Sequence, residues 1–189
     1  MTNEPRTKVT PQQFGLLVAH GLIHILTKDR ESLGAKFLAA ELKADRPCPQ
    51  QARYLTEVLL VGAFAADLVL DQRIESAQEA RLGSIQEARV WMRSALLKVV
   101  NSMREDIGEP FLAADVWDDL VIARFSTYGA LLYTPSAGAN PLLKMVQQAY
   151  RNVTDQEDLD MGVAMHLAVD FGVLFKHRVF DWLNRYEVV

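Results

Sequence analysis

Residues 55–70, LTEVLLVGAFAADLVL, form the stretch of sequence that decides the fold. Apart from Thr56, Glu57 and Asp67 the stretch is apolar or glycine, so a helix built from it is apolar on nearly every side and has to be covered by neighbours. It falls short of the roughly 20 apolar residues that span a bilayer. We therefore predict a buried central helix over residues 50–74 and expect no membrane span.

Helix starts flank this segment on both sides. At each start a side-chain oxygen is placed to accept a hydrogen bond from the first turn, and Pro at the first helical position or Glu three residues later supports it. The four starts are Thr10-Pro11, Ser84 with Glu87, Asn140-Pro141 and Thr154 with Glu157. Because every boundary that the sequence reveals is a helix boundary, we predict an all-α protein.

The spacing of apolar residues predicts a single compact bundle of about seven or eight helices. Their expected ranges are residues 11–28, 30–44, 50–74, 75–82, 84–108, 110–133, 141–152 and 155–186. Gly83 ends the shortest of them. The last and longest begins with acidic and ends with basic residues, as the helix dipole favours, and Gly162 and Gly172 are its candidate bends. We expect residues 1–9 to be flexible and residues 10–189 to form one domain.

The same periodicity predicts which side chains share the core. The expected core residues are Leu59, Val61, Phe64, Leu68, Trp91, Trp117, Leu120, Phe171 and Leu174. Half of the 189 residues are apolar, and Trp182 and Tyr186 lie near the end of the chain. This composition favours apolar surface that remains for a partner, including a second copy of the chain.

Composition also limits the compartment and the partners. Cys48 is the single cysteine, which excludes an internal disulfide and fits a reducing compartment, and residues 1–9 lack the apolar core of a secretory signal. We expect a cytoplasmic protein. The net charge of −4 and the pI near 5.6 argue against affinity for nucleic acid or anionic membranes.

His20 and His24 form the first candidate metal site. A spacing of four residues puts both imidazoles on one helical face, where they can bind a metal together. The zinc-protease pattern requires Glu where the sequence has Gly21. The alternative interpretation is that both histidines belong to a solvent-facing stripe with Gln13, Thr27 and Lys28.

His166 and Asp170 form the second candidate, because they are the strongly polar residues of an otherwise apolar run over residues 161–175. Glu57 and Asp67 of the central helix raise the same question. If all four point at one another, they make a carboxylate and imidazole site for a metal or a ligand. Otherwise the His166 and Asp170 stripe faces solvent, or the pair is buried and hydrogen-bonded for structural reasons.

No motif in the sequence indicates an enzyme class or a cofactor. Gly-rich phosphate loops, nucleophile elbows and Cys-x-x-Cys pairs are absent from it. We expect a small helical protein that acts by protein–protein interaction, as a regulator, adaptor or inhibitor. The alternatives are a metal- or ligand-binding bundle enzyme that uses His166 and Asp170, and a transcription regulator with a degenerate helix-turn-helix near Gly83.

Overall fold

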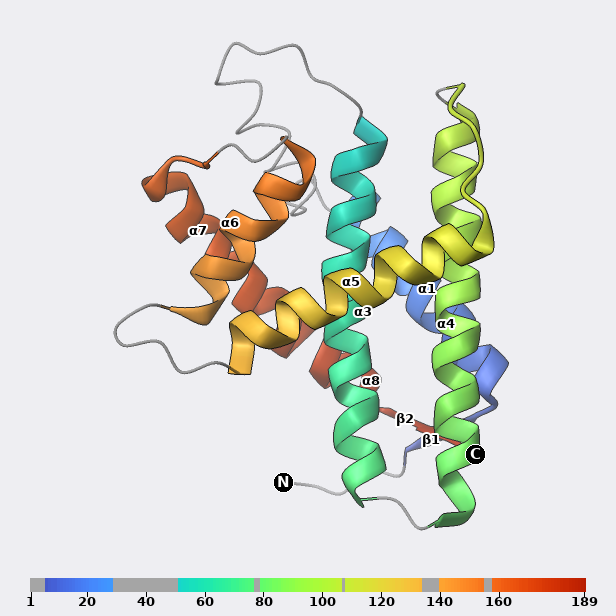
Figure 1. Ribbon diagram of the computed structural model, residues 1–189. Helices are drawn as coiled ribbons and strands as arrows, with labels where there is room; N and C mark the ends of the chain where they lie inside the picture. The colour runs from blue at the N-terminus through green and yellow to red at the C-terminus, as the bar shows by residue number, and fades with distance from the viewer. Residues whose placement is uncertain (1–5, 29–50, 77–78, 107, 134–139, 155–157) are drawn as a thin grey trace.

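A computed structural model describes residues 6–28, 51–76, 79–106, 108–133, 140–154 and 158–189. Six helices longer than one turn account for most of these residues, which confirms the all-α prediction for the described part of the chain (Figure 1). They are α1 (Pro11–Lys28), α3 (Gln51–Ser76), α4 (Glu79–Asp106), α5 (Ala114–Tyr133), α6 (Pro141–Val153) and α7 (Met161–Val173). The expected helix over residues 30–44 and Cys48 lie outside the described residues.

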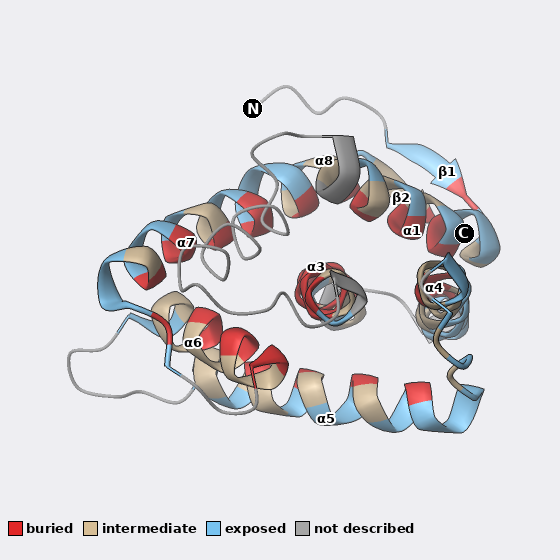
Figure 2. Cartoon of the chain, turned by 90° about the horizontal axis from the view of Figure 1, so that it is seen from above, coloured by how far each residue is buried: buried red, intermediate tan, exposed pale blue. Residues whose placement is uncertain are grey.

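Helix α3 is the centre of the molecule, as its sequence predicts. Figure 2 looks along α3 and shows the other helices arranged around it, with their buried residues turned inward. In the core stretch over residues 58–70 every residue except Asp67 is buried. Of the nine expected core residues seven are buried, and Trp91 and Leu120 are partly exposed. Among the described residues, no helix has the length and hydropathy needed to cross a membrane.

Helices α1 and α4 approach each other closely because α1 carries a glycine at the crossing. A Cβ atom at Gly15 would lie 2.6 Å from the backbone nitrogen of Met92, so any other residue would push the helices apart.

Helix α1 starts where Thr10 predicts. The Thr10 hydroxyl accepts a hydrogen bond from the Gln13 N–H, and the Gln13 side chain accepts one from the Thr10 N–H.

Two predicted boundaries between α3 and α5 are wrong. Helix α4 runs from Glu79 to Asp106 without a break at Gly83, since one helical glycine costs only about 1 kcal/mol, which packing can offset. Helix α5 begins at Ala114 rather than at residue 110. The Asn101 side chain fixes the segment before α5 by donating to the Leu112 carbonyl and accepting from the Leu112 N–H, at 3.1 and 2.8 Å.

The predicted single helix over residues 155–186 is not confirmed. Helix α7 starts at Met161, with Asp160 as its N-cap, whereas the Thr154 hydroxyl bonds back to the Tyr150 carbonyl and closes α6. After α7 the chain continues as a π-helical segment, η1 (Leu174–Phe180), and a last turn, α8 (Asp181–Leu183). The departure from α-helical geometry thus follows Gly172, one of the two expected bends.

Two short strands join the ends of the described chain. Strand β1 (Thr7–Val9) pairs in parallel with β2 (Tyr186–Val188). The register places Thr7 opposite Tyr186 and Val9 opposite Val188. This pairing fixes the C-terminal segment beside α1. That placement leaves a cleft between α1 and the segment formed by η1 and α8.

Candidate functional site: a cationic cleft between α1 and the C-terminal segment

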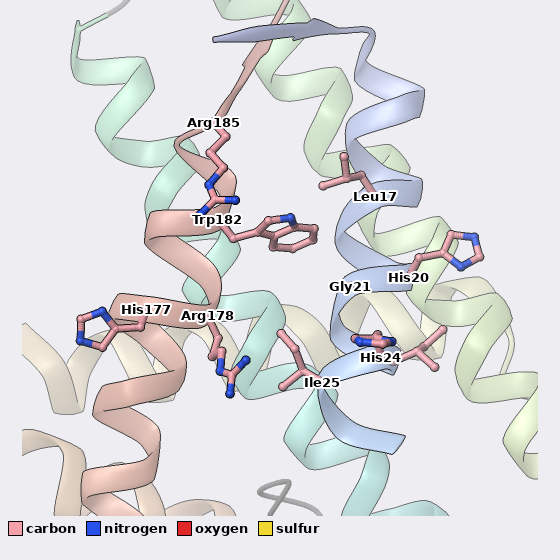
Figure 3. A pocket seen from close by; sticks show the side chains of 10 residues that line it. Leu17, His20, Gly21, His24, Ile25, His177, Arg178, Trp182 and Arg185 are labelled. Carbon is pink, nitrogen blue, oxygen red and sulfur yellow. The ribbon is translucent and has the colours of Figure 1, made fainter. Parts of the chain in front are cut away.

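A cleft of about 720 Å³ separates α1 from the segment formed by η1 and α8 (Figure 3). This volume lies within the range of small-molecule sites, roughly 300 to 1,000 Å³. The residues that line the cleft are Leu17, His20, Gly21, Ile23, His24, Ile25, His177, Arg178, Trp182 and Arg185. They come from two segments about 150 positions apart in the sequence, which only the folded chain brings together.

Helix α1 supplies one wall. His20 and His24 are exposed and lie one turn apart, with Ile25 on the same part of the helix (Figure 3). The solvent-stripe interpretation of the two histidines therefore describes their exposure, but their stripe borders a cleft. Both histidines line the cleft, although the His20 ring points away from Trp182 (Figure 3).

The opposite wall is built around Trp182. Its indole points toward α1 (Figure 3) and rests on Gly21, where a Cβ atom would collide with the ring carbon Cη2. On its other side the indole meets the Tyr186 ring edge to face, with centroids 6.3 Å apart. Arg73 of α3 donates to the Leu183 carbonyl at 2.6 Å and fixes the end of this wall. Gly21 and Tyr186 thus both fix the position of the Trp182 indole.

Arg178 and Arg185 flank Trp182, one turn before it and one turn after it, and both are exposed. His177 lies on the far side of η1 and points away from α1, where its Nδ1 is 3.0 Å from Asp181 (Figure 3). None of the described lining residues is Asp or Glu. The cleft is therefore locally cationic in a chain whose net charge is −4.

The four residues of the predicted carboxylate and imidazole site lie in three separate places. His166 is exposed on α7, where its Nδ1 lies 2.7 Å from the Gly162 carbonyl, and Asp170 is partly buried one turn later. Glu57 is buried near the start of α3, and Asp67 lies ten residues further along it. Among the described residues, no three His, Cys, Asp or Glu side chains are grouped so that they could hold a metal.

Glu57 instead joins a buried polar network between α3, α5 and α6. Its Oε2 accepts from Arg124 Nε at 3.0 Å, and its Oε1 accepts from the Tyr128 hydroxyl and from Asn152 Nδ2, the latter at 2.8 Å. Burial raises the pKa of Tyr128 well above its usual value, and the Glu57 carboxylate raises it further. The phenol therefore stays protonated and donates. These donors satisfy a charge that would be costly to bury alone.

Asp67 faces α4, where its Oδ1 is 2.8 Å from Arg89 Nε. Arg89 also pairs with Asp71 one turn further along α3. Burial raises the pKa of Asp67 above its usual value, and the positive charge of Arg89 opposes this only in part. Glu57 and Asp67 thus both have partners on neighbouring helices, and neither lines the cleft.

Sequence reasoning missed Trp182, Arg178 and Arg185 as members of a site. The spacing from Arg178 to Trp182 and on to Arg185 puts these residues near one face of a helix, which is the one signal that was present.

Comparisons with protein-family models, with curated proteins and with solved structures find no match, so the site is assigned from its geometry and chemistry.

Proposed function

We propose that the protein binds a small molecule that joins an anionic group to an apolar or aromatic body, and that the α1–η1 cleft is the binding site. The observation that carries the proposal is the composition of its walls. Two guanidinium groups and two imidazoles border a cavity of about 720 Å³ that also contains an indole and aliphatic side chains, with no carboxylate among the described lining residues.

The chemistry of the walls assigns a part of the ligand to each. A carboxylate or phosphate suits Arg178 and Arg185, because a guanidinium offers paired N–H donors that match two oxygens of one anion. The apolar body suits Trp182 and Ile25, where burial of apolar surface adds affinity at about 25 cal/mol per Å². His20 and His24 add imidazole N–H groups to the lining of the cleft.

Phenyl phosphate is a suitable probe because it combines both parts in one small molecule. We expect saturable binding with a Kd of about 1 mM or tighter, measured by isothermal titration calorimetry. Benzyl alcohol has the ring without the charge, benzylamine has the opposite charge, and inorganic phosphate lacks the ring. Each of these should bind about tenfold more weakly or not at all.

Substitution of one arginine locates the binding. Arg185→Gln should weaken phenyl phosphate binding by about tenfold, because a charge-assisted hydrogen bond contributes on the order of 1.5 kcal/mol or more. Lys98→Gln removes the same charge from an exposed position of α4 and serves as the matched control. Equal affinity in parent, Arg185→Gln and Lys98→Gln proteins would contradict the proposal, as would tighter binding of benzylamine.

Interaction with another protein, the function expected from the sequence, is the second candidate. Four exposed apolar side chains of α7 favour it: Met161, Met165, Val169 and Val173. The enzyme alternative has no support from the described residues, since no three His, Cys, Asp or Glu side chains among them are grouped so that they could hold a metal. The helix-turn-helix alternative requires a turn near Gly83, and that residue lies inside α4.

A further inference from the structure

Helix α7 leaves a continuous apolar face in contact with solvent. Met161, Met165, Val169 and Val173 are 58, 59, 67 and 43% exposed. They are spaced four residues apart, so their side chains form one ridge along the helix. Within α7, which the structure describes completely, the other exposed residues are Gly162 and His166.

The opposite face of α7 is already used. Ala164, Leu167, Ala168 and Phe171 are buried in the core, so the helix is apolar nearly all round. Figure 2 shows the exposed face turned outward, away from α3 and α6. An exposed apolar face of this size is typical of a surface that binds a partner.

The order of residues along this face is symmetric about its own centre. Around a point midway between Met165 and Val169, Met161 corresponds to Val173, so apolar residues of the exposed ridge stand at equal distances on both sides of the centre. A two-fold axis through that point therefore places matching residues of two antiparallel helices opposite each other.

The charges at the two ends follow the same symmetry. Asp158 precedes the helix and Lys176 follows it, both are exposed, and the same centre relates them. Asp158 already accepts from Arg151 at 2.6 Å, but its side chain remains 68% exposed and has lone pairs free for a second donor. An antiparallel pair of helices thus puts Asp158 of each copy next to Lys176 of the other.

We propose that the exposed face of α7 binds a second copy of this chain in antiparallel orientation, with the two-fold axis between Met165 and Val169. The two helix dipoles then also oppose each other favourably. The helix is about 20 Å long, so the contact buries less than the roughly 1,200 Å² of a standard interface. The dimer is therefore weak, with a Kd of about 10 μM.

Sedimentation velocity over a range of protein concentrations measures this Kd. Val169→Glu places two like charges beside the axis and should weaken the dimer by about tenfold or more. Val90→Glu changes an equally exposed valine of α4, 66% against 67%, and should leave the Kd unchanged. Far-ultraviolet circular dichroism checks that both variants stay folded.

A charge swap tests the antiparallel arrangement itself. Asp158→Lys and Lys176→Asp each place like charges opposite each other and should weaken the dimer by about threefold, while the double variant should restore the parent Kd. A parent protein that stays monomeric at about 1 mM, or a Kd unaffected by Val169→Glu, would overturn the proposal. Binding of the monomer to phosphatidylcholine vesicles, lost in Val169→Glu, would assign the face to a membrane surface instead.

Discussion

Arg124→Met is the substitution that most sharply tests the buried network around Glu57. Among the described residues, Arg124 is the positively charged donor to the Glu57 carboxylate, which is 5% exposed. The substitution removes this donor and leaves the aliphatic part of the side chain in place. Loss of one partner from a buried ion pair costs about 3 to 5 kcal/mol, because the remaining charge stays buried without compensation. Tyr128 and Asn152 still donate to Glu57, so we expect the lower end, about 3 kcal/mol.

A double-mutant cycle separates this cost from any general damage to packing. In a Glu57→Gln background there is no buried carboxylate that could lose its counter-charge. Arg124→Met should therefore cost only about 1 kcal/mol or less. The coupling energy is then about 2 kcal/mol. Arg151→Met provides a matched control, because its partner Asp158 is 68% exposed and such surface pairs contribute about 0 to 1 kcal/mol.

Urea denaturation followed by far-ultraviolet circular dichroism gives the four free energies of unfolding, provided that the slope with denaturant stays constant across the variants. If Arg124→Met costs the same in both backgrounds, within about 0.5 kcal/mol, the two side chains are not coupled and the reasoning is refuted.

Three further predictions concern single positions. Burial raises the pKa of Asp67 in the folded protein above 3.8. Above this raised pKa the folded protein holds a partly buried ionised carboxylate, which lowers the free energy of unfolding. That loss disappears as the pH falls toward 3.8. Asp67→Asn should therefore unfold at a higher urea concentration than the parent at pH near 7, and this gain in stability should shrink as the pH is lowered. A loss of stability at neutral pH would show that the Arg89 contact outweighs burial. Gly21→Ala should displace the Trp182 indole and weaken phenyl phosphate binding by about tenfold while the helix content is kept, and unchanged calorimetric affinity would argue against an indole wall. Phe171→Ala should lower the free energy of unfolding by about 3 to 5 kcal/mol, because Phe171 is fully buried; a change below about 1 kcal/mol in a urea titration would contradict its place in the core.

Local signals in the sequence predicted the parts of the fold that depend on local contacts. Thr10-Pro11 and Asn140-Pro141 gave the starts of α1 and α6, because both residues of each pair act within the first turn. Gly83 and Thr154 misled the prediction since the same residues suit other positions, one inside a packed helix and one at the end of α6. The choice between these roles depends on tertiary packing.

The candidate site could be predicted only in part for the same reason. The sequence brought out His20 and His24, whose spacing is local, but not Trp182, which meets Gly21 across about 160 positions. The partners of Glu57 are equally distant: Arg124 and Asn152 carry no mark that sets them apart from surface residues. Such contacts arise from the way that helices pack, which periodicity alone does not encode.

The indole N–H signals of the three tryptophans, followed by NMR during a titration with phenyl phosphate, test the central claim most directly. Trp182 lines the cleft, whereas Trp117 is buried elsewhere and donates to the Arg93 carbonyl at 2.9 Å. We predict that the Trp182 signal shifts and saturates while the Trp117 signal stays in place, and that benzylamine shifts neither. A Trp182 signal that does not move, or that moves equally with benzylamine, would contradict the assignment of the cleft to an anionic ligand.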